Sequence, residues 1–302
     1  MATVSVLHSD WGPIDTFRQT YHSNGKAGRT TFVKGIHPDS DYVLLGMNDK
    51  PNSEIMSYFR LEQRILIVME NPSIWEPNEE TLRNAGIIVS PFPSHKKHDK
   101  SIFIQSHPAI PWFYGIEFDC NHGLTHKPTR SLLSLDDMIE MKKPHKQKIL
   151  SMIVSGKNNS PGYVWRHALA KRLKEVLGPD CDIYGFGHNP VPDKRVAIDP
   201  YYFTIVIENE SADYYWTEKL SDAYLGFAYP IYAGDRRVRE DFTASISTID
   251  FFGEIDASVK KVTKIISRHS SDYDRAILEN RQKILFDHNL FYMLDNIIQR
   301  IP

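Results

Sequence analysis

The chain lacks the features that mark several large protein classes. Two of its 302 residues are cysteines, and Cys120 and Cys181 stand in neither a metal-binding nor a thioredoxin-like spacing. So low a count is typical of a reducing compartment, and we interpret both as packing residues. The formal net charge of −2 gives no electrostatic reason for nucleic-acid binding, so we expect no nucleic-acid partner.

Long hydrophobic runs are missing too. No segment approaches the roughly 20 apolar residues of a membrane-spanning helix, and the first residues, MATVSVLHSDWGP, lack a basic stretch followed by an apolar one. We therefore expect a cytoplasmic protein without a transmembrane segment. Residues 273–301 have apolar positions at helical spacing, which favours a core-facing helix, with peripheral membrane contact as the alternative.

Several catalytic motifs are absent as well. The sequence has no G-x-G-x-x-G, Walker A, G-x-S-x-G or H-E-x-x-H pattern, which disfavours dehydrogenases, P-loop nucleotidases, α/β-hydrolases and zinc enzymes. Two D-x-D strings occur, at 39–41 and 180–182. Such short strings arise by chance, and the second lies in a helix-to-strand turn, where Asp is common. We therefore expect no essential metal or other cofactor.

Strand-like and helix-like segments alternate along the chain. The expected strands are 4–7, 42–45, 65–69, 86–89, 151–155, 182–185, 203–207 and 228–232, and the expected helices are 78–85, 163–177 and 217–225. This alternation predicts an α/β protein with two parallel-sheet domains, 1–147 and 148–270, followed by C-terminal helices at 271–302. The 41% hydrophobic content is ordinary for a globular protein and suffices for two cores.

One stretch, residues 207–234, places four kinds of polar group in a single strand-to-helix passage. The β-branched run at 203–207 predicts a buried parallel strand, and Thr217 is suited to cap the helix that follows. Ligands bind at such carboxyl ends of strands in open α/β sheets. The polar residues expected there are Asn209, Tyr215, Glu218 and Lys219.

These side chains suit a diphosphate-containing ligand. A helix N-terminus favours an anion, and Lys219 adds a full positive charge. Glu218 can accept hydrogen bonds from sugar hydroxyls, and Tyr215 offers a flat ring and a hydroxyl. Arg166 is expected in the first turn of the helix at 163–177, where the helix dipole disfavours a cation unless an anion compensates it. The alternative is that these are ordinary surface charges and that the tyrosine belongs to the core.

The passage resembles the signature of the α-1,3-fucosyltransferase family, which runs F-E-N-S, a short spacer, then Y-x-T-E-K-(L/I). The matching residues are Glu208, Asn209, Tyr215, 217–220, 222–224, 229–232 and Gly234, and the bacterial members are especially similar. Two positions depart from the pattern. Glu210 stands where Ser or Thr is common, and Tyr214 where animal members often have Asp.

The resemblance implies a GT-B fold, in which two Rossmann-like domains face each other. Residues 1–147 would bind the acceptor, 148–270 would bind the donor, and the helices at 271–302 would pack back toward the first domain. The implied activity is an inverting transfer of L-fucose from GDP-β-L-fucose to a glycan hydroxyl on N-acetylglucosamine or a neighbouring sugar. Such an enzyme would place two cations on the diphosphate where other transferases use a metal.

The same resemblance assigns roles to the residues of the second domain. Arg166 and Lys219 would hold the donor diphosphate. Asn209, Tyr215 and Glu218 would position the ribose and the fucose. Two alternatives remain: a related GT-B glycosyltransferase that uses another nucleotide-activated sugar, and a non-catalytic nucleotide-binding or glycan-binding protein with the same fold.

Glu70 is the candidate catalytic base. It follows the strand-like run at 65–69 and precedes Asn71, so we expect it where the strand meets the cleft between the domains. The family has its catalytic Glu in a Gly-Glu-Asn turn, and here Met69 replaces the Gly. The alternative is a solvated Glu at the end of a strand.

Glu117 is the rival base. It belongs to an aromatic-rich segment, residues 112–119, which we expect to shape the acceptor pocket because aromatic faces pack on sugar rings. Trp112 and Tyr114 are the acceptor-binding candidates in this segment. Packing in the core is an equally good interpretation of their pattern.

Overall fold

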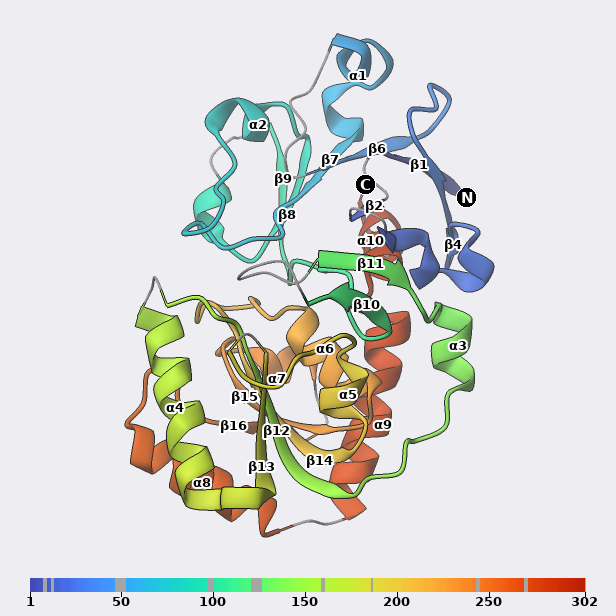
Figure 1. The fold of residues 1–302 in the computed structure, drawn as a ribbon. Coiled ribbons are helices and arrows are strands. Elements are labelled where there is room, and N and C mark those ends of the chain that lie inside the picture. Colours follow the sequence, from blue (N-terminus) through green and yellow to red (C-terminus); the bar gives the residue numbers. More distant parts are fainter. Residues whose placement is uncertain are drawn as a thin grey trace.

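The computed structural model describes residues 1–7, 10–11, 14–46, 53–96, 100–120, 127–158, 161–185, 187–242, 245–268 and 271–301. The chain forms two largely parallel sheets, which lie one above the other in Figure 1 with helices packed against them. The carboxyl ends of the central strands of the two sheets meet at the level where the sheets approach each other. The predicted arrangement of two facing α/β units is confirmed.

The first sheet has seven strands in the order β4-β5-β1-β6-β7-β8-β9. All neighbours run parallel except β4 and β5, which are antiparallel. The strands are β1 (Ala2–Val6), β4 (Lys26–Ala27), β5 (Thr30–Lys34), β6 (Tyr42–Leu45), β7 (Arg64–Ile67), β8 (Ile87–Ser90) and β9 (Ile102–Gln105). The short helices α1 (Ser53–Tyr58) and α2 (Glu79–Arg83) connect them, and β2 (Asp10–Trp11) pairs with β3 (Ile14–Asp15) beside the sheet.

The second sheet has five parallel strands in the order β13-β12-β14-β15-β16. They are β12 (Lys148–Val154), β13 (Cys181–Gly185), β14 (Tyr201–Ile207), β15 (Tyr229–Ala233) and β16 (Ser247–Thr248). The chain passes from β12 to β13 on one side, whereas β14 continues to β15 on the other. The sheet therefore has a topological switch point between β12 and β14, the place where open α/β sheets bind ligands.

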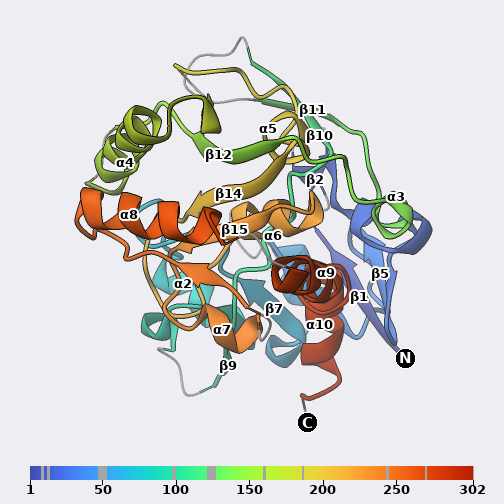
Figure 2. The ribbon, with the colours of Figure 1, turned by 90° about the horizontal axis from the view of Figure 1, so that it is seen from below.

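Helices cover both faces of this second sheet. α4 (Pro161–Leu177) packs with α8 (Ile255–Ile266), while α6 (Glu218–Leu225) packs with α9 (Ser271–Phe286). Figure 2 shows the first pair on one side of the strands and the second pair on the other. The remaining short helices are α3 (Leu135–Glu140), α5 (Arg195–Ile198) and α7 (Val238–Asp241).

Two segments connect the sheets. The antiparallel hairpin of β10 (Ile116–Asp119) and β11 (Lys127–Ser131) lies between them in Figure 1. At the end of the chain, α10 (Leu290–Ile298) returns to the first sheet and packs in its core. Asn289 lies between α9 and α10 and is the N-cap of α10. Its side chain accepts hydrogen bonds from the first backbone N–H groups of that helix.

The predicted strands agree with the structure within three residues. Two differences concern candidate site residues. β7 ends at Ile67, so Glu70 lies three residues beyond the strand. α4 begins at Pro161, a residue that is favourable at a helix start, so the prediction that Arg166 lies in the first turn is wrong by about two residues. None of the helices in the described part of the chain is long and apolar enough to span a membrane.

Candidate active site

A cavity of about 220 Å³ opens at the switch point, over the carboxyl ends of β12 and β14. The first turns of α6, the helix α4, the loop that precedes α5 and the segment around β10 contribute its walls. Its polar lining residues are Ser155, Arg166, Lys194, Thr204, Glu218, Lys219 and Asp222. Three of these seven, Arg166, Glu218 and Lys219, were site candidates from the sequence.

Glu208 fixes the start of α6. Its carboxylate is fully buried and accepts hydrogen bonds from the Thr217 backbone N–H at 2.8 Å and from the Thr217 hydroxyl at 2.7 Å. The same carboxylate lies 3.0 Å from the Lys219 ammonium. Thr217 is the N-cap residue, as its sequence position predicted. The buried acid thus holds the cap and the cation in one arrangement.

Lys219 remains charged although it is three-quarters buried. Burial lowers the pKa of its ammonium, but the carboxylates of Glu208 and Glu218 outweigh this effect and raise the pKa. Glu218 stays ionised as well. Burial raises the pKa of its carboxyl, and the ammonium groups of Lys219 and Lys194 lower it further than burial raises it. The first turn of α6 therefore carries a fixed pair of opposite charges.

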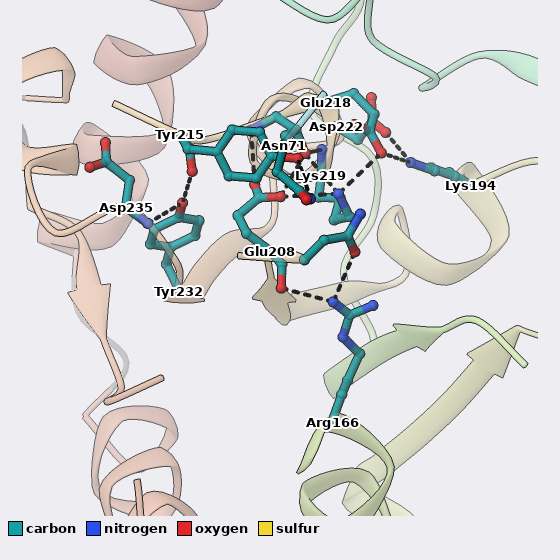
Figure 3. A network of polar contacts seen from close by, with 12 residues as sticks. Asn71, Arg166, Lys194, Glu208, Tyr215, Glu218, Lys219, Asp222, Tyr232 and Asp235 are labelled. Atoms are coloured by element: carbon teal, nitrogen blue, oxygen red, sulfur yellow. Dashed lines mark hydrogen bonds and ion pairs between the residues drawn. The ribbon is translucent and has the colours of Figure 1, made fainter. Parts of the chain in front are cut away.

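Arg166 reaches the same place from α4. One of its Nη atoms donates to the Glu208 carbonyl at 2.9 Å and to the Asn209 side-chain oxygen at 3.2 Å. Figure 3 shows this guanidinium below Glu208, with Lys219 and Glu218 above. Burial lowers the pKa of Arg166, although the guanidinium keeps its charge. Its Nε and the Ser155 hydroxyl are both buried and make no hydrogen bond within the described structure.

These two unpaired groups have a clear chemical meaning. A buried donor that makes no hydrogen bond costs about 1–3 kcal/mol, so native proteins rarely leave one without a function. Arg166 and Ser155 both line the cavity. The arrangement therefore suits a ligand that brings oxygen acceptors and negative charge to this wall.

The first sheet contributes Glu70 and Asn71 from the loop after β7. The Asn71 amide donates to the Tyr215 hydroxyl at 3.5 Å, which links the two sheets. Burial raises the pKa of Glu70, while the Lys219 ammonium lowers it and the Glu218 carboxylate raises it. Among the described residues, Glu70 is not part of the cavity lining, so its link to α6 is this electrostatic influence on its pKa. Tyr215 itself is buried against Phe92, with ring centroids 5.5 Å apart.

The aromatic-rich segment has a different place from the one expected. Trp112 and Tyr114 are buried, and the Tyr114 hydroxyl donates to Asp199 at 2.6 Å, so both belong to the core and present no surface to a glycan. Their acceptor-binding assignment is therefore corrected in favour of core packing. Glu117 is partly exposed on the hairpin and pairs with Arg130 at 2.8 Å. The hydrogen bond from Arg130 lowers the pKa of Glu117, whereas a general base benefits from a raised one.

The two D-x-D strings have structural partners. Asp41 accepts a hydrogen bond from the Thr3 backbone N–H, and Asp182 pairs with Lys148. Among the residues whose placement is described, no three His, Cys, Asp or Glu side chains gather in a way that could hold a metal ion.

Besides Thr204, three polar lining residues were not predicted as site residues from the sequence. Ser155 was placed at the end of a strand without a role, and Asp222 appeared within the motif without one. Lys194 lies in the loop before α5 and approaches Asp222 at 2.5 Å and Glu218 at 3.8 Å. No local pattern marks such a residue, because the crossover from β13 to β14 brings it to the cavity.

Comparisons with known proteins agree with the resemblance of the motif. No protein-family model matches the chain. An α-(1,3)-fucosyltransferase of Helicobacter pylori is 28% identical over 150 residues, which are 49% of this chain and 31% of that protein. The match thus spans less than a third of the relative's length.

Solved structures of α1,3-fucosyltransferases are also similar. One with GDP-fucose has a TM-score of 0.49 and 20% identity, covering 93% of this chain and 82% of that one. Another, with GDP, has a TM-score of 0.49 and 17% identity, covering 96% and 92%. The chain resembles the α-1,3-fucosyltransferases, as the motif around Tyr215 and Lys219 predicted.

Proposed function

We propose that the chain is a fucosyltransferase-like glycosyltransferase that transfers L-fucose from GDP-β-L-fucose to a glycan hydroxyl with inversion. The observation that carries the proposal is the cavity at the switch point, where the buried Arg166 Nε and Ser155 hydroxyl have no hydrogen-bond partner among the described residues and Lys219 supplies a second cation. A sugar nucleotide brings the acceptor oxygens and the negative charge that these groups need. The bacterial relative is named an α-(1,3)-fucosyltransferase.

The second sheet would bind the donor. Arg166 and Lys219, which both contact Glu208, hold the diphosphate and offset the charge that develops as GDP departs. Glu218 accepts hydrogen bonds from a sugar hydroxyl, and Asn209 fixes the Arg166 guanidinium at 3.2 Å. Because Tyr215 is buried, its role is to support Asn71 beside the proposed base. This set needs no metal for the diphosphate.

The first sheet would supply the base. The Glu70 carboxylate takes the proton of the acceptor hydroxyl as the hydroxyl oxygen attacks the anomeric carbon of fucose. The bond from that carbon to the GDP oxygen breaks, and GDP leaves with the electron pair. The raised pKa of Glu70 strengthens it as a base. Activity should therefore fall on acidification at a pH above that expected for an ordinary Glu.

Glu70→Gln tests the function and the base together. GDP release from GDP-fucose is measured with a panel of oligosaccharides that contain N-acetylglucosamine. We expect turnover to fall about 10²–10⁴-fold in Glu70→Gln, with GDP binding retained. The control is Glu117→Gln, on the exposed hairpin, which should keep wild-type turnover.

Three outcomes would contradict the assignment. Full turnover by Glu70→Gln would exclude Glu70 as the base. Loss of turnover in Glu117→Gln instead would move the base to the hairpin. Turnover by the wild type with another sugar nucleotide and none with GDP-fucose would replace the donor.

A further inference from the structure

The Glu218 carboxylate lies between two ammonium groups. Lys219 Nζ is 3.7 Å from its Oε1 atom, and Lys194 Nζ is 3.8 Å from the same atom. Lys219 shares its side of the cavity with Glu208, next to Arg166. Lys194 approaches from the other side, where Figure 3 shows it beside Glu218 and Asp222 and away from Tyr215. The three charged groups thus follow one another along the cavity in the order Lys219, Glu218, Lys194.

The surroundings of Lys194 differ from those of Lys219. Phe113, Phe118, Val191 and Ile198 line the cavity there, and the Lys194 ammonium lies 5.1 Å from the centroid of the Phe113 ring. The Phe113 and Phe118 rings meet edge to face at 5.9 Å between centroids. Apolar walls with a single cation favour a flat heteroaromatic ring that presents an acceptor atom to that cation.

Lys194 is held in place by contacts of its own. The Asp222 carboxylate lies 2.5 Å from its Nζ atom and accepts the backbone N–H groups of Phe113 and Tyr114 at 2.8 Å each. An ammonium group has three N–H donors, and Asp222 accepts one of them, whereas Glu218 at 3.8 Å is an ion-pair neighbour beyond hydrogen-bond distance. Within the described part of the chain, the remaining donors are available for a ligand. The Asp222 carboxylate therefore fixes the Lys194 ammonium and the aromatic wall relative to each other.

We propose that Lys194 binds the nucleobase of the donor and selects a purine with a carbonyl oxygen at position 6. The inference rests on the proposed function, because it takes the Lys219 end as the diphosphate end. In a nucleoside diphosphate the ribose separates the phosphates from the base, which matches the order of the three charged groups. Guanine presents the acceptors O6 and N7 on one edge, whereas adenine places an amino group at position 6. An ammonium donor discriminates between these two bases.

Three nucleotides and two substitutions of Lys194 test this selection. GDP and IDP both carry O6 and N7, and ADP differs from IDP by the amino group at position 6. Calorimetric titrations of each nucleotide are compared for the wild type, Lys194→Met and Lys194→Arg. The wild type should bind GDP and IDP at least tenfold more tightly than ADP. Lys194→Met should remove this preference by weakening GDP and IDP and not ADP, and Lys194→Arg should retain part of it.

A matched control separates binding from folding. Lys148→Met removes a lysine that pairs with Asp182 outside the cavity, and it should leave all three affinities unchanged. Thermal unfolding of each variant is recorded beside the titrations. If Lys194→Met weakens GDP, IDP and ADP equally, its role is structural, through Asp222, and the proposal is overturned.

The failure of this inference differs from the failure of the proposed function. A wild-type protein that binds GDP, IDP and ADP equally, with Lys194→Met unchanged, would retain the diphosphate site and exclude base selection by Lys194. A protein that binds no nucleoside diphosphate would overturn both.

Discussion

Glu208→Ala should destabilise the fold and the proposed donor site together. The substitution removes the buried acceptor of three contacts: the Thr217 N–H at 2.8 Å, the Thr217 hydroxyl at 2.7 Å and the Lys219 ammonium at 3.0 Å. In the described part of the chain, Lys219 then keeps Glu218, at 3.7 Å, as its one carboxylate neighbour within ion-pair distance. Removing one partner of a buried ion pair typically costs about 3–5 kcal/mol. Because a quarter of the Lys219 side chain is exposed, we expect about 3 kcal/mol.

The pH dependence of this loss has a defined sign. The folded protein raises the pKa of Lys219 above its unfolded value of about 10.4. A raised ammonium pKa contributes stability that is complete below the unfolded pKa and is lost as the pH rises through the folded one. The difference between wild type and Glu208→Ala should therefore stay constant between about pH 6 and pH 9.

A double-mutant cycle measures the coupling energy between Glu208 and Lys219. Unfolding in denaturant is followed for Glu208→Ala, Lys219→Met and the double variant, and the coupling energy should reach about 1–3 kcal/mol. Glu210→Ala is the control, since this partly exposed residue lies two positions away and accepts only from the neighbouring Ser211 N–H among the described contacts. If the effects of the two single substitutions add within about 0.5 kcal/mol, Glu208 and Lys219 do not stabilise each other and the prediction is wrong.

Two further predictions concern other parts of the second sheet. Burial raises the pKa of Asp235 to about 7, so its contribution to stability is complete below about pH 4 and is lost as the pH rises to 7. Asp235→Asn keeps the oxygen that accepts the Tyr214 and Arg237 N–H groups. The substitution should flatten the pH profile of thermal unfolding. An unchanged profile would show that Asp235 does not cause the pH dependence. Gly185→Ala should cost far more stability than Gly178→Ala, because both glycines have positive φ but an added Cβ lies 1.8 Å from the Val154 carbonyl oxygen only at Gly185. Equal melting temperatures of the two variants would count against this.

The passage from β14 to α6 was predictable because its signals are local. A β-branched run specifies the strand, Thr217 caps the helix, and strand-end geometry brings Glu208 and Lys219 together. The aromatic segment was not predictable in the same way. The rings of Trp112 and Tyr114 suit a core and a sugar-binding pocket equally well, and only the packing of the hairpin between the sheets decides.

Long-range contacts account for the features of the site that the sequence did not predict. Lys194 reaches the cavity through a crossover between strands, and Glu208 has its function through a buried pair that spacing alone does not reveal. Glu70 was placed on the correct loop, but its approach to α6 depends on how the two sheets face each other. Helix and strand patterns carry no information about that orientation.

We propose that the cavity at the switch point binds the diphosphate of a guanine nucleotide through Arg166. The most direct test is calorimetric binding of GDP, with UDP and CDP beside it, to the wild type, Arg166→Ala and Arg172→Ala. Arg172 is the matched control, because it lies on the same helix and pairs with Asp256 at 2.7 Å. We expect GDP-selective binding that Arg172→Ala preserves and that Arg166→Ala weakens at least tenfold, about 1.4 kcal/mol. Undiminished GDP binding by Arg166→Ala would show that Arg166 does not bind the diphosphate.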